Sequence, residues 1–154
     1  MCLGTMPLVF VSLWEWYFFS EGDDIDAKMR YFMNTAGATT MLAGSWAKLP
    51  AVRSQFGGPA FGNLAVAYGA STVSVSKFWS AFVTEDGNGP HRSTAVYVLV
   101  GFGMSQLALQ GVLVSVLETF TEDVYDVISV FACFSFVLAA VMGLVPWIGR
   151  ALST

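Results

Sequence analysis

The spacing of charge along this chain is the feature that most limits what it can fold into. Only 7 basic and 11 acidic residues occur among 154, and they leave long stretches without charge. These stretches are 1–14, 31–47, 54–76, 93–117 and 127–149. A helix needs about 20 apolar residues to cross a bilayer core of about 30 Å. The pattern therefore predicts an all-α integral membrane protein.

The uncharged stretches predict about five transmembrane helices in a single domain that covers residues 1–154. Short connections between them favour antiparallel neighbours, and thus an up-down bundle. The first helix is marginal, because its apolar run is short and carries Glu15; it either spans the bilayer or lies in the interface, and we expect it to span. The expected helices are 3–19, 31–49, 60–84, 93–117 and 127–149.

The connections and small residues add detail to this bundle. Residues 21–30 and 118–126 are expected to be acidic loops, and the Pro and Gly residues of 50–59 predict a break between helices. The second helix is rich in small and hydroxyl residues, so it belongs inside a protein contact rather than in lipid. The spacings Gly58–Gly62 and Ala139–Gly143 match a packing motif that is common in membrane helices.

The N-terminal run does not resemble a cleaved targeting segment. It lacks the basic start and the small-residue cleavage site of a secretory signal, and it lacks the arginines of a transit peptide. We therefore expect that the first helix directs insertion, that a leader has already been removed, or that the protein is made inside an organelle.

Composition argues against several classes of function. The net charge of −4 leaves no basic stripe for nucleic acid. The single histidine, His91, excludes a metal site of several His and Cys residues. Cys2 and Cys133 make no disulfide framework, and Cys133 is expected to be a buried small apolar side chain. We therefore expect no catalytic, cofactor-binding or metal-binding residue, no cofactor and no enzymatic activity.

The third helix has a patterned face with two interpretations. Small and hydroxyl side chains allow close helix packing, which is the simpler interpretation, but they could also line a polar path through a transporter or channel. At 100° per residue this face consists of Asn63, Ala67, Ala70, Ser71, Ser74 and Lys77.

Two charged residues, Glu15 and Lys77, lie inside the expected spans at more than two residues from either end. Lys77 lies about 10 Å of helix from the end of its segment, so its side chain is expected to reach outward to Glu85 and Asp86 on the next loop. Glu15 is expected to reach water or a neighbouring chain. We expect Lys77 to have a structural role rather than to carry a proton or substrate.

The fourth helix has two distinct polar or small-residue faces. Gly101, Met104 and Ala108 share one side, whereas Gln106 and Gln110 lie on the other side with Gly103. A glutamine amide that faces lipid would leave polar groups unsatisfied. One face can pack within the chain, so Gln106 and Gln110 are expected to contact another chain, a lipid headgroup or a cofactor, with another chain or a bound lipid favoured.

These features together favour an accessory subunit of a large energy-converting membrane complex, of the respiratory chain, an ATP synthase or a similar assembly. Its partners would be other membrane subunits and bound lipids, and the mitochondrial inner membrane is expected before the thylakoid membrane. The alternatives are a small transporter or channel, and a membrane enzyme or cofactor carrier. The expected contacts with partners or lipids are made by Lys77, Gln106, Gln110, Glu122, Asp123 and Asp126.

Overall fold

The chain folds into helices alone wherever the structure, a computed structural model, describes it, namely over residues 2–19, 24–56, 58–83, 94–116 and 122–152. The all-α prediction is therefore confirmed for these residues. Two of the helices, over Thr94–Val116 and Val124–Leu144, are long and apolar enough to cross a membrane, with mean hydropathies of 1.6 and 2.5. The elements are α1 (Cys2–Phe19), α2 (Ile25–Ala47), the 3-10 helix η1 (Arg53–Phe56), α3 (Pro59–Phe82), α4 (Thr94–Val116) and α5 (Glu122–Leu152).

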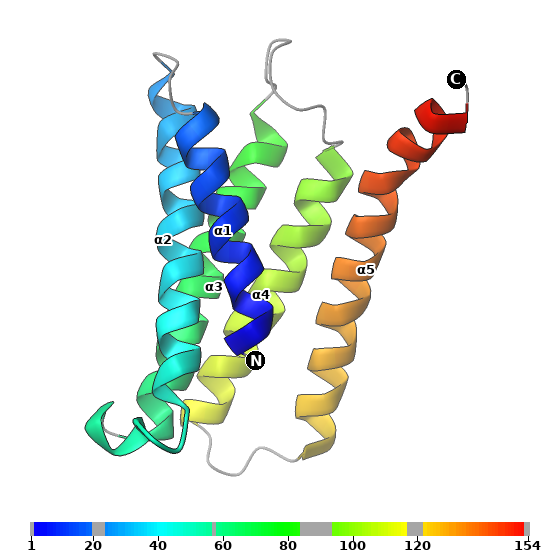
Figure 1. Cartoon of the computed structure of the whole chain (residues 1–154). Coiled ribbons are helices and arrows are strands. Elements are labelled where there is room, and N and C mark those ends of the chain that lie inside the picture. Colours follow the sequence, from blue (N-terminus) through cyan, green and yellow to red (C-terminus); the bar gives the residue numbers. More distant parts are fainter. Residues whose placement is uncertain (1, 20–23, 57, 84–93, 117–121, 153–154) are drawn as a thin grey trace.

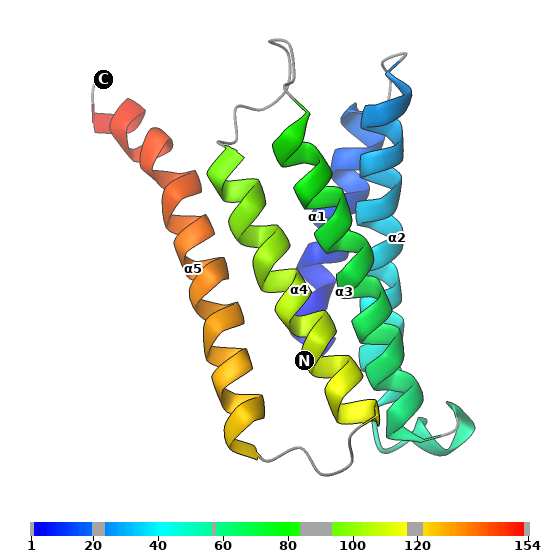
Figure 2. The same ribbon diagram turned by 180° about the vertical axis from the view of Figure 1, so that it is seen from behind.

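The helices form an open row rather than a closed bundle. Consecutive helices run antiparallel, and α2, α3, α4 and α5 lie side by side in that order (Figure 1). Figure 2 shows from behind that α1 crosses one face of this row, and its main packing partner is α2. Each helix packs chiefly on the next one in the chain. As a result α5 is an edge of the row, held mainly by α4.

Two helices begin earlier than the charge pattern predicts. The Asp24 carboxylate caps α2 by accepting hydrogen bonds from the backbone N–H groups of Asp26 (2.9 Å) and Ala27 (3.3 Å), so the helix starts at Ile25. Three acidic residues of the other expected loop, Glu122, Asp123 and Asp126, likewise fall at the start of α5, which begins at Glu122. Negative charge is favourable at both places, because the N-terminus of a helix carries partial positive charge.

The contact between α2 and α3 depends on two reciprocal pairs of glycines. A Cβ atom added to Gly37 would lie 2.7 Å from the Gly69 carbonyl oxygen, and one added to Gly69 would lie 2.5 Å from the Gly37 carbonyl oxygen. Gly44 and Gly62 form the second pair, with Cβ positions 2.8 Å from each other's carbonyl oxygens. The two backbones therefore touch at levels where no side chain fits.

These contacts recur every seven residues on both helices. On α2, Arg30 comes seven residues before Gly37, and on α3, Ser76 comes seven residues after Gly69. The Ser76 hydroxyl donates a hydrogen bond to the Arg30 carbonyl oxygen at 2.8 Å. The pairs Arg30–Ser76, Gly37–Gly69 and Gly44–Gly62 thus form three levels of one antiparallel register. A seven-residue repeat keeps one seam of a helix facing its partner when the two supercoil gently.

The helix α4 packs on both of its neighbours through further small residues. A Cβ on Gly111 would lie 2.8 Å from the Asn63 carbonyl oxygen of α3, and a Cβ on Gly103 would lie 2.8 Å from the Phe136 ring of α5. The two faces predicted for this helix are therefore real, and the second one meets α5 of the same chain. By contrast, nothing lies within 4 Å of a Cβ on Gly143, so the Ala139–Gly143 spacing marks no close contact within the described chain.

We predict that Gly37→Ala and Gly69→Ala each lower the free energy of unfolding by about 1–3 kcal/mol, because the new methyl group forces two backbones apart. Gly143→Ala is the matched control. Its methyl group enters open space, so the gain in helix propensity leaves stability unchanged or higher by up to about 1 kcal/mol. Denaturant unfolding of the purified protein in micelles, followed by circular dichroism, measures all three. Equal effects at Gly69 and Gly143 would contradict the packing described above.

Candidate functional site

The largest change from expectation is a charged pair between α1 and α3. The Lys77 ammonium lies 3.8 Å from the Glu15 carboxylate, and each side chain is only 12% exposed. Lys77 was expected to reach outward to Glu85 and Asp86, which lie outside the described residues, and Glu15 to reach water or another chain. Within the described residues the Glu15 carboxylate reaches Lys77 rather than water, because α1 lies across α2 close enough to offer Lys77 an acid inside the protein. The expected contact of Lys77 with Glu85 and Asp86 stays a prediction.

Asn34 on α2 connects this pair to the rest of α1. Its side-chain Nδ2 donates to the Ser12 hydroxyl oxygen (3.0 Å) and to Glu15 Oε2 (3.4 Å). The next residue, Thr35, donates its hydroxyl to the Ser12 carbonyl oxygen at 3.0 Å. Asn34 is 3% exposed, and its Oδ1 accepts no hydrogen bond from the described residues. Polar contacts thus hold α1 in place at one helical level.

One further basic residue is buried on α2, and one aromatic ring lies near the pair. Arg30, expected in a loop, is instead buried in the second turn of α2, and its Nε donates to the Asp26 carbonyl oxygen at 3.3 Å. The Lys77 ammonium also lies 6.0 Å from the centroid of the Tyr97 ring on α4, at a distance where cations and aromatic faces attract each other. We call the group of Ser12, Glu15, Asn34, Lys77 and Tyr97 the polar cluster.

The remaining hydroxyls of α3 are bonded to helix backbone. Ser74 donates to the Gly101 carbonyl oxygen of α4 at 2.8 Å, and Ser71 donates to the Ala67 carbonyl oxygen within its own helix at 2.9 Å. These bonds agree with the packing interpretation of the patterned face. Asn63, on the same face, borders a cavity.

Gln110 finds its partners within the chain. It is 4% exposed, and its Nε2 donates to the Ser129 hydroxyl (2.7 Å) and to the Tyr125 carbonyl oxygen (3.2 Å), both on α5. Its donor group therefore needs no other chain. Gln106, half-buried one turn earlier, remains a predicted contact with a partner or lipid. The sequence showed that this face meets protein, but not that α5 supplies it.

A cavity of about 90 Å³ lies at the end of the row opposite the polar cluster. It is bordered by side chains of α2, α3, α4 and α5, among them Ser45, Lys48, Asn63, Gln110 and Tyr125. Among these, sequence analysis had singled out only Asn63 and Gln110. Ser45 and Lys48 are three residues apart, so they lie one turn apart on the same face of a helix rich in small residues. That spacing could have indicated that both residues line one cavity.

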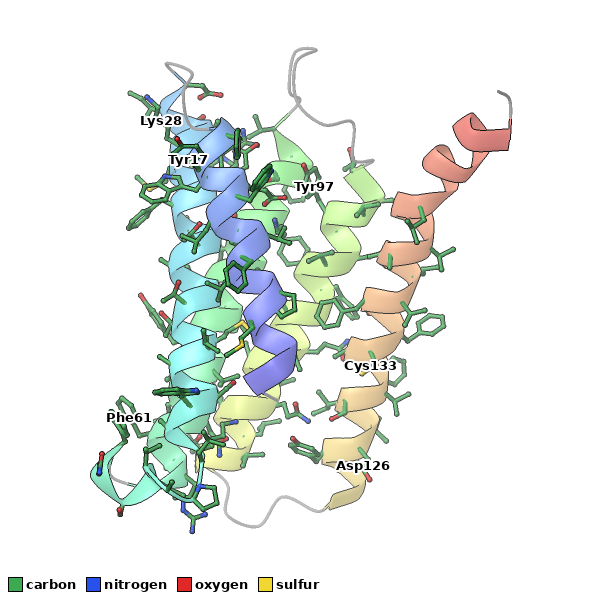
Figure 3. The ribbon with its side chains drawn as sticks, viewed as in Figure 1. Tyr17, Lys28, Phe61, Tyr97, Asp126 and Cys133 are labelled. Carbon is green, nitrogen blue, oxygen red and sulfur yellow. The ribbon has the colours of Figure 1, made fainter. Side chains whose placement is uncertain are left out.

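The residues expected to meet partners around α5 are exposed where the structure describes their side chains. Asp126 is exposed near the start of the helix, and Cys133 is exposed further along it (Figure 3). The expectation that Cys133 is buried is therefore wrong, because α4 covers only one side of α5. The backbones of Glu122 and Asp123 form the first turn of α5, while their side chains lie outside the described part.

No three His, Cys, Asp or Glu side chains of the described chain come together as metal ligands require. In the polar cluster the acid Glu15 on α1 is paired with the base Lys77 on α3, and this pair attaches α1 to the other helices. The chain matches no protein-family model, no curated protein and no solved structure.

We predict that Lys77→Met lowers the free energy of unfolding by about 3 kcal/mol, because it leaves the Glu15 charge buried without its cation. The double variant Glu15→Leu/Lys77→Met is expected to lose much less than the sum of the two single losses, since it removes both charges. Lys28→Met, at an exposed position, is the control and should change stability by less than about 0.5 kcal/mol. Urea unfolding in micelles supplies the values, and strictly additive losses would argue against the pair.

Proposed function

We propose that the chain is an integral membrane protein with all five helices in the bilayer. The outward face of α3 supports this most directly. Its exposed side chains include Phe61 near one end and Phe82 at the other, with Leu64, Tyr68 and Val75 between them. Twenty-one residues separate the two phenylalanines, or about 31 Å of helix. That length matches a bilayer core of about 30 Å.

Aromatic side chains gather at both ends of the helix row, as they do at the two surfaces of a membrane. Tyr17 and Lys28 lie at one end and Phe61 lies at the other (Figure 3). The exposed aromatic residues of the first end include Trp14, Trp16, Tyr17, Phe18, Phe32 and Phe82, and those of the second end include Trp46, Phe56 and Phe61.

The modest hydropathy of α2 and α3 fits this location, because their polar groups face the protein. Asn34, Ser74, Ser76 and Lys77 are buried or nearly so and are bonded across the helix contacts. A membrane helix that packs on both sides can keep polar residues inward and apolar residues outward. Mean hydropathy averages the two faces and so understates how apolar the outer one is.

We further propose that the protein is an accessory subunit that assembles with other membrane chains in an energy-converting complex. The observation that carries this proposal is the bare face of α5. Only α4 packs extensively on this helix, and most of its large side chains are exposed. They are Val127, Val130, Phe131, Phe134, Val137, Leu138, Val141, Met142 and Leu144.

Acidic residues at the start of α5 could set the orientation of a partner on this face. Glu122, Asp123 and Asp126 cluster in its first turns, and Asp126 is exposed. Complementary charge sets orientation between partners more than it sets affinity. We propose that these acids meet a basic surface of a neighbouring subunit, and that bound lipids fill the remaining gaps. Among energy-converting membranes, the short loops and near-complete helical content suit the mitochondrial inner membrane first and the thylakoid second.

Cys133 gives a direct test of membrane burial. In a variant with Cys2→Ala, a membrane-impermeant maleimide is expected to leave Cys133 unlabelled in open membrane sheets, although the thiol is exposed on the isolated chain. Lipid or a neighbouring membrane chain excludes the reagent, because this chain itself leaves the thiol exposed. Ser54→Cys, at an exposed position of η1 and in a Cys2→Ala/Cys133→Ala background, is the positive control and should react within minutes. Rapid labelling of Cys133 in the intact membrane would contradict the proposed location.

The native mass of the gently solubilised particle tests assembly. We expect co-migration with redox or ATPase subunits, and we expect Phe134→Ala/Val137→Ala to release the chain from that particle without changing its helical content. Neutralising Glu122, Asp123 and Asp126 together should weaken incorporation as well, and more so at high salt. Phe61→Ala, on the outward face of α3, is the control. A small homo-oligomer would favour the transporter or channel instead.

A further inference from the structure

The cavity between α2, α3, α4 and α5 is layered from the surface inward. Lys48 lies at the end of α2 and Tyr125 near the start of α5, so both mark the outer level. Ser45, Asn63 and Gln110 line the middle level, and Met41 and Leu107 line the deepest part. Its volume of about 90 Å³ is several times the space that one water molecule requires.

The middle level holds two buried polar side chains and one half-buried polar side chain, and their hydrogen-bonding capacity is not fully used within the described residues. Ser45 and Gln110 are each 4% exposed. Across the described residues, the Ser45 hydroxyl and the Asn63 amide make no hydrogen bond, and Gln110 uses only its Nε2. Buried polar groups in folded proteins are almost always paired with protein, water or ligand. Ser45 and Gln110 are two such groups, and with the half-buried Asn63 beside them they indicate that something polar occupies the cavity.

The chemistry of the lining favours an anion. Lys48 is the single charged residue among those that border the cavity, and Ser45 and Asn63 offer further donors. An ammonium, a hydroxyl and an amide together suit a group with several acceptor oxygens and negative charge. In the proposed membrane location, the exposed aromatic residues Trp46 and Phe61 would lie at the membrane surface, where lipid phosphates lie. Basic pockets between membrane helices commonly hold such headgroups.

We propose that this cavity binds a phosphate group, with Lys48 at its mouth and Ser45 and Asn63 as the inner donors. A lipid headgroup and free inorganic phosphate offer the same oxygens. The lipid source rests on the proposed membrane location, whereas the phosphate chemistry does not. Assembly with other subunits is not required, so failure of the accessory-subunit proposal would leave this one intact.

Two binding experiments on the purified full chain separate the sources. Native mass spectrometry compares retention of phosphatidic acid with that of diacylglycerol, the same lipid without its phosphate. Thermal unfolding in an uncharged detergent compares inorganic phosphate with chloride at equal ionic strength. Preference for phosphatidic acid alone assigns a lipid headgroup, stabilisation by phosphate alone assigns a soluble ion, and a response in both assigns the shared group. No preference in either experiment would overturn the proposal.

Variants locate the binding. Lys48→Met keeps the side-chain stem that packs near Gly62 and is expected to weaken phosphate or phosphatidic acid binding about tenfold or more. Ser45→Ala and Asn63→Leu are expected to weaken it less, by a few-fold each. Lys28→Met, an exposed lysine at the far end of the same helix, and Ser71→Ala are the matched controls and should bind like the wild type. If Lys28→Met weakens binding as much as Lys48→Met, the attraction is general and the proposed site is wrong.

Discussion

The close approach of α2 and α3 is the constraint on which the rest of the structure depends. Two reciprocal glycine pairs let the backbones touch, so the surrounding side chains meet over a long seam. The buried residues Met41, Ala70, Val73, Met104 and Ala108 form the core beside that seam. In the proposed membrane location there is no strong hydrophobic force between helices, so tight packing and hydrogen bonds would have to supply the attraction. Both are present at this contact.

The polar cluster follows from the same geometry. Asn34 and Lys77 come from the two helices joined by the glycine seam, and they present their polar groups to α1 together. Ser12 and Glu15, one turn apart on α1, meet them at that place. A wider separation of α2 and α3 would move the amide and the ammonium apart, and α1 would lose the partners that satisfy its acid. The attachment of α1 is therefore secondary to the packing of the pair beneath it.

The sequence was sufficient for the number and direction of the helices, because long uncharged stretches and short connections leave few alternatives. It was insufficient for helix starts, since Asp24 is at once part of an acidic run and a cap. Periodicity placed Lys77 and Gln110 on faces but could not say which helix lies opposite. Glu15 and the α5 residues that bond to Gln110 emerged only in three dimensions, as did the exposure of Cys133.

The seven-residue recurrence along α2 and α3 has a consequence for how the two helices find each other. If one helix slid past the other by seven residues, one glycine pair would still form, so glycine packing by itself tolerates a neighbouring alignment. That alignment would bring a glycine opposite Arg30 or Ser76 and break the hydrogen bond between those two residues. The Arg30–Ser76 hydrogen bond is therefore the contact that distinguishes the native alignment from its neighbours. The glycines allow the close approach of the helices, and the hydrogen bond between Ser76 and Arg30 fixes their register.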